Sequence, residues 1–195
     1  KIISIMIKII GGKYKGSNLN VPLGNKVRPT SIGKRKIIFD ILTSFFLKQD
    51  NIENYNNKII LDGFSGSGAM GIEAISRGAS FCYFFDKDKS IIINLKKNCK
   101  KILLNNQYKI INSNFENLDY NKIKNKIDIV FIDPPYEYNI NEKKIEILKK
   151  IIADDVIIVI EISSKSKTPI ISFLEIFNEK IIGKTKIIFY KKLFK

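Results

Sequence analysis

Apolar residues recur along this chain with two different periods, and the alternation of the two predicts its architecture. Short apolar runs typical of buried strands alternate with stretches whose apolar positions are spaced as on amphipathic helices. The predicted strands cover residues 58–62, 81–85, 108–112, 127–132 and 156–161, and the predicted helices cover 69–78, 90–104, a short segment ending near 124, and 141–152. This pattern predicts an α/β fold, a parallel sheet with helices on both faces.

The two ends of the chain depart from this alternation. Before the first parallel strand, strands over 2–10 and 19–21 flank a basic turn at 11–16, a loop covers 21–29, and Ser31 is placed to cap a helix. At the other end, residues 173–182 and 185–191 flank Gly183 and Lys184, which predicts an antiparallel hairpin at one sheet edge. We therefore expect seven strands, mostly parallel, in a main domain over 51–195, preceded by a small basic hairpin and helix over 1–50.

Composition limits the class of protein. The chain has 195 residues and is 45% hydrophobic, which suits one domain with a small appendage. No apolar run approaches the about 20 residues of a membrane helix. Residues 1–7 lack the unbroken apolar run and cleavage site of a signal peptide, and Met6 is a candidate first residue. Cys82 and Cys99 form no disulfide framework, so free thiols in a cytoplasmic protein are expected.

The basic residues are concentrated near the N-terminus. The net charge is +15, and residues 1–36 hold nine basic side chains and no acidic one. Ile, Lys and Asn are abundant, which indicates a compositional bias that by itself raises the lysine count. The arginines are therefore better evidence for nucleic-acid binding, and two of the three in the chain, Arg28 and Arg35, lie in this segment. An unopposed basic segment favours binding to a polyanion through counterion release. We expect residues 8–36 to bind nucleic acid, with Lys13, Lys15, Arg28 and Arg35 as the contacting residues.

Several kinds of chemistry are excluded by what the chain lacks. It contains no histidine, which excludes imidazole bases, Ser-His triads and histidine-ligated metals. Its two cysteines and scattered carboxylates show no metal-site spacing. A reaction that needs neither a metal nor an imidazole is therefore expected.

A glycine-rich loop follows the first parallel strand. Gly66, Gly68 and Gly71 satisfy G-x-G-x-x-G, so a nicotinamide dinucleotide and a dehydrogenase reaction have to be considered. In that fingerprint the first glycine follows the strand almost directly, whereas here residues 62–65 intervene. Asp62 would also repel a pyrophosphate, and its carboxylate suits a ligand that carries an ammonium and a sulfonium.

Polar residues also follow the second and third strands, where ligands of open parallel sheets bind. Asp86 can accept both ribose hydroxyls of a nucleoside, in NAD and S-adenosylmethionine alike, and Asp88 is the alternative acid, as a helix N-cap. Asn114 can hydrogen-bond an adenine edge while Phe115 packs on the ring. A plain loop is the alternative for this pair.

The fourth strand ends in a motif made of Asp133, Pro134, Pro135 and Tyr136. Two consecutive prolines cannot continue a sheet, so the chain turns sharply there. Asp133 and the Pro134 carbonyl can accept both N–H bonds of an exocyclic amine, and Tyr136 can stack on the ring that carries it. An ordinary strand-ending turn is the alternative interpretation.

These motifs together resemble a known family. The sequence D-x-F-x-G-x-G at 62–68 with DPPY at 133–136 resembles class I S-adenosylmethionine-dependent amino-methyltransferases, which have a Rossmann-like fold. The segments GGKYKG at 11–16 and RPT at 28–30, with GSGAMGIEAISRGA at 66–79, narrow the resemblance to the RsmD family of bacterial 16S rRNA guanine-N2 methyltransferases. The resemblance extends from about residue 7 to 190. This chain departs from the usual sequence of the family at Gly33, Lys36 and Asp86.

The resemblance implies a function and a set of site residues. It implies methyl transfer from S-adenosylmethionine to N2 of a guanine in 16S rRNA, free or within the assembled or assembling small subunit. The expected location is the cytoplasm of a bacterium or a bacterial-derived organelle, and a monomer is expected because nothing in the sequence demands a partner chain. The implied cofactor contacts are Asp62, Phe64, Gly66, Gly68, Asp86, Asn114 and Phe115, and the implied catalytic motif is residues 133–136. Two alternatives remain: an adenine-N6 methyltransferase acting on RNA or DNA, and a non-catalytic RNA-binding factor for ribosome assembly.

Overall fold

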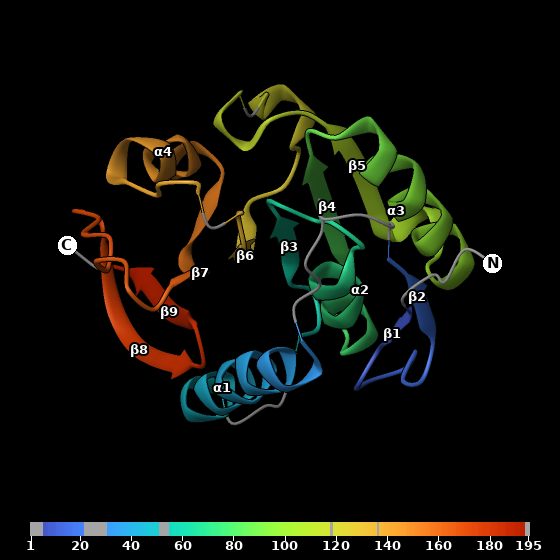
Figure 1. Cartoon of the computed structure of the whole chain (residues 1–195), viewed down its shortest axis with the longest axis horizontal. Coiled ribbons are helices and arrows are strands. Elements are labelled where there is room, and N and C mark those ends of the chain that lie inside the picture. The colour runs from blue at the N-terminus through green and yellow to red at the C-terminus, as the bar shows by residue number, and fades with distance from the viewer. Residues whose placement is uncertain (1–5, 22–30, 51–54, 118, 136, 194–195) are drawn as a thin grey trace.

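The computed structural model describes residues 6–21, 31–50, 55–117, 119–135 and 137–193 (Figure 1). Its central feature is a seven-stranded sheet with the order β5-β4-β3-β6-β7-β9-β8. The strands are β3 (Ile59–Asp62), β4 (Phe81–Asp86), β5 (Tyr108–Asn112), β6 (Ile127–Ile132), β7 (Ile152–Ser163), β8 (Leu174–Ile182) and β9 (Thr185–Lys192). The first five pair in parallel, and β9 pairs antiparallel with β7 and β8. The prediction of seven mostly parallel strands with an antiparallel C-terminal hairpin is confirmed.

Helices cover both faces of this sheet. On one face, α1 (Ile32–Asp50), α2 (Ala69–Ser76) and α3 (Lys89–Ile102) contribute to a hydrophobic cluster that includes Ile60. On the other face, α4 (Glu142–Glu146) contributes to a second cluster that includes Leu61. Successive residues of a strand point to opposite faces, so the apolar run of β3 serves both clusters.

Two helix predictions need correction. The helix expected over 141–152 ends early: α4 stops at Glu146 and continues as a 3₁₀ helix over Ile147–Lys150, because β7 already begins at Ile152. The helix expected before residue 124 is replaced by two 3₁₀ turns, Phe115–Asn117 and Tyr120–Lys122. The predicted caps are confirmed, since Ser31 Oγ accepts a hydrogen bond from Lys34 N (3.3 Å) and Asp88 Oδ1 accepts one from Ser90 N (2.8 Å).

The N-terminal hairpin, β1 (Met6–Lys8) and β2 (Asn18–Asn20), is antiparallel as predicted. β1 ends two residues before the predicted residue 10, and β2 begins and ends one residue earlier than predicted. Part of the predicted strand over 2–10 and most of the loop over 21–29 lie outside the described residues. The hairpin turn rests on the C-terminal end of α2, where Ser76 O accepts a hydrogen bond from Lys13 N (2.6 Å). At Gly12, which has φ 73°, a Cβ atom would lie 1.8 Å from that same oxygen. Only glycine therefore allows this close approach.

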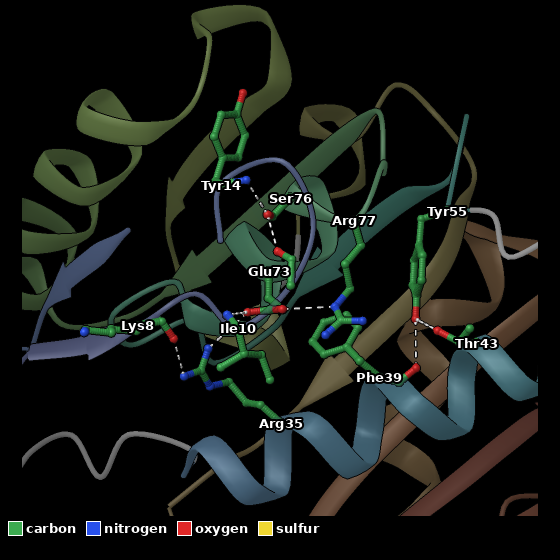
Figure 2. Close-up of polar contacts among 11 residues, drawn as sticks. Lys8, Ile10, Tyr14, Arg35, Phe39, Thr43, Tyr55, Glu73, Ser76 and Arg77 are labelled. Atoms are coloured by element: carbon green, nitrogen blue, oxygen red, sulfur yellow. Dashed lines mark hydrogen bonds and ion pairs between the residues drawn. The ribbon is translucent and has the colours of Figure 1, made fainter. Parts of the chain in front are cut away.

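A buried carboxylate joins the hairpin, α1 and α2 (Figure 2). Glu73 of α2 accepts hydrogen bonds from Ile10 N (2.8 Å) and from Arg77 Nε (3.0 Å), and its Oε2 lies 3.4 Å from Arg35 Nη1. Arg35, which comes from α1, also donates to the carbonyl of Lys8 (2.8 Å). We call Arg35, Glu73 and Arg77 the Glu73 cluster. Through this cluster and the shared hydrophobic cluster, the described part of the first fifty residues (6–21 and 31–50) packs against the sheet domain. The domain boundary near residue 50 stays a prediction.

No helix in the described ranges is long and apolar enough to cross a membrane.

Candidate active site at the carboxyl edge of the sheet

The parallel strands bring four acidic residues to one edge of the sheet. Asp62 and Asp86 are the last residues of β3 and β4, Asp133 directly follows β6, and Glu161 lies near the end of β7. The strand register places Asp62 opposite Phe131, and Ile132 opposite Ile160. Asp133 and Glu161 are therefore the next residues of two neighbouring strands. This edge of an open parallel sheet is where ligands bind.

Asp62 is buried, with 3% of its surface exposed. Its Oδ2 accepts a hydrogen bond from Gly71 N (3.1 Å) in the first turn of α2. Burial is the main reason why the pKa of Asp62 rises to about 7, and the charges of Asp133 and Asp86 add to the effect. Among the described residues no lysine or arginine forms an ion pair with Asp62, so a cationic ligand would relieve this unbalanced charge.

The glycine loop lies against Asp62 and Asp86. Gly66 and Gly68 have φ values of 52° and 84°, in the left-handed region that glycine tolerates. Gly66 N donates to Asp86 Oδ2 (3.1 Å), while a Cβ on Gly68 would lie 2.5 Å from the side chain of Leu95. The absence of side chains at these glycines therefore lets a ligand approach the loop backbone closely between β3 and α2, as the binding of a nucleoside requires.

Asp86 is half-buried and already accepts two backbone hydrogen bonds, from Gly66 N (3.1 Å) and Asp88 N (3.0 Å). Burial raises the pKa of this carboxyl. Each carboxylate oxygen offers more than one acceptor position, so these two bonds fix the side chain and leave capacity for ribose hydroxyls.

Three aromatic rings lie beside the loop. Phe64 lies 5.4 Å from the Phe115 ring at 33° and 5.2 Å from the Tyr138 ring at 67°, measured between ring centroids. Phe115 is buried next to Gly63, where a Cβ would lie 2.9 Å from the phenylalanine ring. Asn114 begins the following 3₁₀ turn, and its carbonyl accepts a hydrogen bond from Asn117 N (3.0 Å). The predicted adenine contacts, Asn114 and Phe115, therefore lie next to the predicted Phe64.

The proline motif borders a cavity of about 230 Å³. Pro134 is buried, Pro135 is exposed, and the Pro135 carbonyl accepts a hydrogen bond from Tyr138 N (2.8 Å), which closes the turn. The cavity is lined by Pro134, Pro135, Tyr138, Ile140, Glu161 and Ser163, among others. β6 lies between β3 and β7 in the sheet, so Asp133, which directly follows β6, lies between Asp62, which precedes the glycine loop, and Glu161, which lines the cavity. Tyr136 lies outside the described residues.

Sequence reasoning missed two residues at the cavity, Glu161 and Tyr138. Glu161 is 4% exposed, and its Oε2 lies 2.6 Å from Lys34 Nζ of α1. The signal for Glu161 was present, because it follows an apolar run just as Asp62 and Asp133 do. Tyr138 gave no such signal, since it belongs to the turn after the prolines.

The predicted RNA contacts separate into three groups. Lys13 and Lys15 are exposed on the hairpin turn, as a phosphate-binding role requires. Arg28 lies outside the described residues. The prediction for Arg35 is wrong: its side chain is 0% exposed and is held by Glu73 and the Lys8 carbonyl, so it cannot reach a phosphate (Figure 2).

Comparisons with known proteins agree with this geometry. The model of the family described as conserved hypothetical protein 95 matches residues 7–191. "Ribosomal RNA small subunit methyltransferase D" of Buchnera aphidicola is 33% identical over 187 residues, which are 94% of this chain and 92% of that protein. The solved structure of a "putative methyltransferase yhhF from Escherichia coli" superposes with a TM-score of 0.75 at 29% identity, covering 96% of this chain and 98% of that one. The structure of the "putative methylase HI0767 from Haemophilus influenzae" gives a TM-score of 0.75 at 25% identity, over 96% and 99% of the two chains.

Proposed function

The chain belongs to the conserved hypothetical protein 95 family, which includes the RsmD methyltransferases, and from this premise we propose that it methylates the exocyclic N2 of a guanine in 16S ribosomal RNA. The observation that carries the proposal is the position of Asp133, between the glycine loop and the cavity beside the prolines. A carboxylate in this position can face both a methyl donor at the loop and an amine in the cavity.

The residues at the loop fit S-adenosylmethionine. This cosubstrate supplies a methyl group already activated on a positively charged sulfur. Asp62, which is buried without a cationic partner among the described residues, would accept its ammonium group. Asp86 would accept the ribose hydroxyls, and Phe115 with Asn114 would bind the adenine.

The chain's main task is to prepare the nucleophile. The lone pair of a guanine N2 is delocalised into the ring, so the amine has to be oriented before it can attack. Asp133 and the Pro134 carbonyl would accept its two N–H bonds and direct the lone pair at the methyl group, which can lower the barrier by up to about 7–11 kcal/mol. The Asp133 carboxylate would also stabilise the positive charge that develops on the nitrogen.

The base has to leave its stack to reach this cavity. Enzymes that modify bases act on extruded or single-stranded nucleotides, and Tyr136 would stack on the extruded ring for about 1–3 kcal/mol. The exposed Lys13 and Lys15, together with Arg28, would bind the surrounding phosphates. We propose that the RNA extends from the carboxyl edge of the sheet, at the first turn of α2, to the hairpin turn, which contacts the last residue of the same helix.

The proposal is tested by transferring tritium from methyl-labelled S-adenosylmethionine to small subunits from a strain that lacks the enzyme. Digestion to nucleosides is expected to release the label as N2-methylguanosine, and mapping of the rRNA gives the nucleotide. Naked 16S rRNA, assayed in parallel, identifies the preferred form of the substrate.

Two outcomes of this experiment would contradict the proposal. Label recovered in N6-methyladenosine would assign the chain to the adenine methyltransferases. Absence of transfer, combined with calorimetric binding of RNA but not of S-adenosylmethionine, would indicate a non-catalytic assembly factor.

A further inference from the structure

We propose that Glu161, held by Lys34, recognises the target guanine by accepting the hydrogen bond of its N1–H. This inference rests on the proposed function and deepens it, because it identifies the residue that distinguishes guanine from adenine. The motif at 133–136 cannot make that distinction, since both bases carry an exocyclic amine.

The first argument is the position of Glu161. Ile132 of β6 pairs with Ile160 of β7, so Asp133, the first residue after β6, lies beside Glu161, which still belongs to β7. Adjacent strands lie about 4.8 Å apart, which is comparable to the width of a base edge. Glu161 also lines the cavity together with Pro134 and Pro135. A base whose amine is bound by Asp133 would therefore present its adjacent ring nitrogen to Glu161.

The second argument is the cost of placing a carboxylate there. Glu161 follows five consecutive apolar residues of β7 and is 4% exposed, and the described charged groups that shift its pKa are Lys34 and Asp133. Burial is the main reason why the pKa of Glu161 rises to about 7, and Asp133 raises it further although Lys34 opposes the shift. A buried carboxylate next to Asp133 adds little to the stability of the fold. The position of Glu161 therefore favours a role in binding a ligand that donates a hydrogen bond.

The third argument is the match with guanine. Along its Watson–Crick edge guanine presents an acceptor at O6, a donor at N1 and donors at N2. Lys34, Glu161 and Asp133 offer a donor followed by two acceptors, which is the complementary order. Adenine has an acceptor at N1, and its lone pair would face the Glu161 carboxylate.

The experiment changes the base and keeps the nucleophile. Small subunits are reconstituted with 16S rRNA in which the mapped guanine is replaced by 2-aminopurine, which retains the 2-amino group but carries an acceptor at N1 and a hydrogen in place of O6. We expect the wild-type enzyme to prefer guanine by at least about 100-fold in kcat/KM, because an unmatched polar group is strongly rejected in a site built to pair with it.

The variant Glu161→Gln is expected to remove this preference. If Lys34 keeps the amide oxygen, the amide NH₂ takes the place of the other carboxylate oxygen and offers a donor to the base. That donor opposes N1–H of guanine and pairs with N1 of 2-aminopurine, so the ratio of the two kcat/KM values should fall to about one or below. The same loss is expected for binding of the two RNAs in the presence of S-adenosylhomocysteine.

Glu146→Gln is the matched control, because it neutralises the carboxylate of another lysine ion pair (2.9 Å to Lys149) on the exposed surface. This control should keep the wild-type preference and the wild-type melting temperature. Equal methylation of both RNAs by the wild type, or an undiminished preference in Glu161→Gln, would overturn the inference. A wild-type enzyme that transfers no methyl group even to the guanine RNA would instead refute the proposed function.

Lys34→Met provides a second test that does not depend on the folding of Glu161→Gln. It removes the cation that lowers the pKa of Glu161, while Asp133, which raises that pKa, remains. The carboxyl should then stay protonated to a higher pH, and a neutral carboxyl is a weaker acceptor for N1–H than a carboxylate. We expect the guanine preference of Lys34→Met to be reduced at pH 7 and to recover at higher pH, and an unshifted pH profile would contradict the proposed role of the pair.

Discussion

Two regions of this molecule bury carboxylates, and they do so in opposite ways. In the Glu73 cluster the carboxylate is 0% exposed but is contacted by two arginines and a backbone N–H, so its charge is compensated within the chain. At the carboxyl edge of the sheet, Asp62 is also buried, but among the described residues no cation forms an ion pair with it, and Asp133 raises its pKa. Glu161 beside it has a single cation, Lys34, which compensates only part of the effect of burial and of Asp133 on its pKa. A buried acid whose charge the chain compensates fully indicates a structural role, whereas neighbouring buried acids whose charges the chain compensates only in part indicate a site that awaits a ligand.

The largest expected effect is at the repelling acids. Asp133→Ala should lower turnover by about 10²–10³-fold, because the amine loses its main acceptor and the developing charge loses its counterion. The affinity for S-adenosylhomocysteine should change little, since Asp133 is proposed to face the base. Single-turnover kinetics and calorimetry measure the two quantities, and near-normal turnover would remove Asp133 from the reaction.

The second effect concerns the compensated acid. Glu73→Ala leaves Arg35 buried without its counterion, which should destabilise the fold by about 3–5 kcal/mol. Urea denaturation measures this loss. The contrast is Glu161→Gln, whose amide oxygen can still accept a hydrogen bond from Lys34 while its neutral side chain relieves the repulsion with Asp133, so it should cost far less. If both variants lost the same stability, the distinction between the two regions would fail.

The third effect is on cosubstrate affinity and follows from the sign of the pKa shift. The pKa of Asp62 is raised from 3.8 to about 7, so its carboxylate is ionised only above that pH. Because the ammonium of S-adenosylhomocysteine needs the ionised form, affinity should fall about tenfold between pH 8 and pH 6. Asp62→Asn is the control: it should bind weakly at both pH values and show no such dependence in calorimetry.

The smallest effect is expected at the exposed lysines of the hairpin turn. Lys13→Ala combined with Lys15→Ala should reduce the salt slope of RNA binding by about two, one for each phosphate contact. The control pair, Lys149→Ala with Lys150→Ala, removes two exposed lysines next to α4, on the opposite side of the molecule from the hairpin (Figure 1). Equal slopes for the two double variants would show that the hairpin turn does not contact the RNA.

The sequence predicted the site residues whose position follows from neighbouring residues in the chain, and it failed where the position depends on contacts between distant segments. Asp62, Asp86 and Asp133 could be identified because each ends an apolar run, and parallel strands bring their ends together. Glu161 obeys the same rule and could have been found. Arg35 could not be assigned, because its burial depends on Glu73, which lies 38 residues away in the sequence. The arginine composition of a segment does not show which of its side chains turn inward.

The failed helix predictions have a similar cause. Residues 141–152 carry a helical pattern, but pairing with β6 extends β7 back to Ile152 and takes over the end of that segment. Tertiary pairing of a strand overrides local periodicity at such a boundary. Cavity residues such as Tyr138, which belong to irregular turns, have no period from which they could be recognised.

The contacts at the two ends of α2 limit how the RNA specificity of this enzyme can be changed. All eight residues of the helix are buried; its first turn donates a hydrogen bond to Asp62, and its last residue binds the N-terminal hairpin. A chimera that exchanged the first fifty residues for another protein's RNA-binding module would remove Ile10 and Arg35, two of the three partners of Glu73, along with the hairpin. Retargeting to a different RNA is therefore expected to succeed through substitutions on the exposed turn around Lys13 and Lys15, and to fail through exchange of the whole segment.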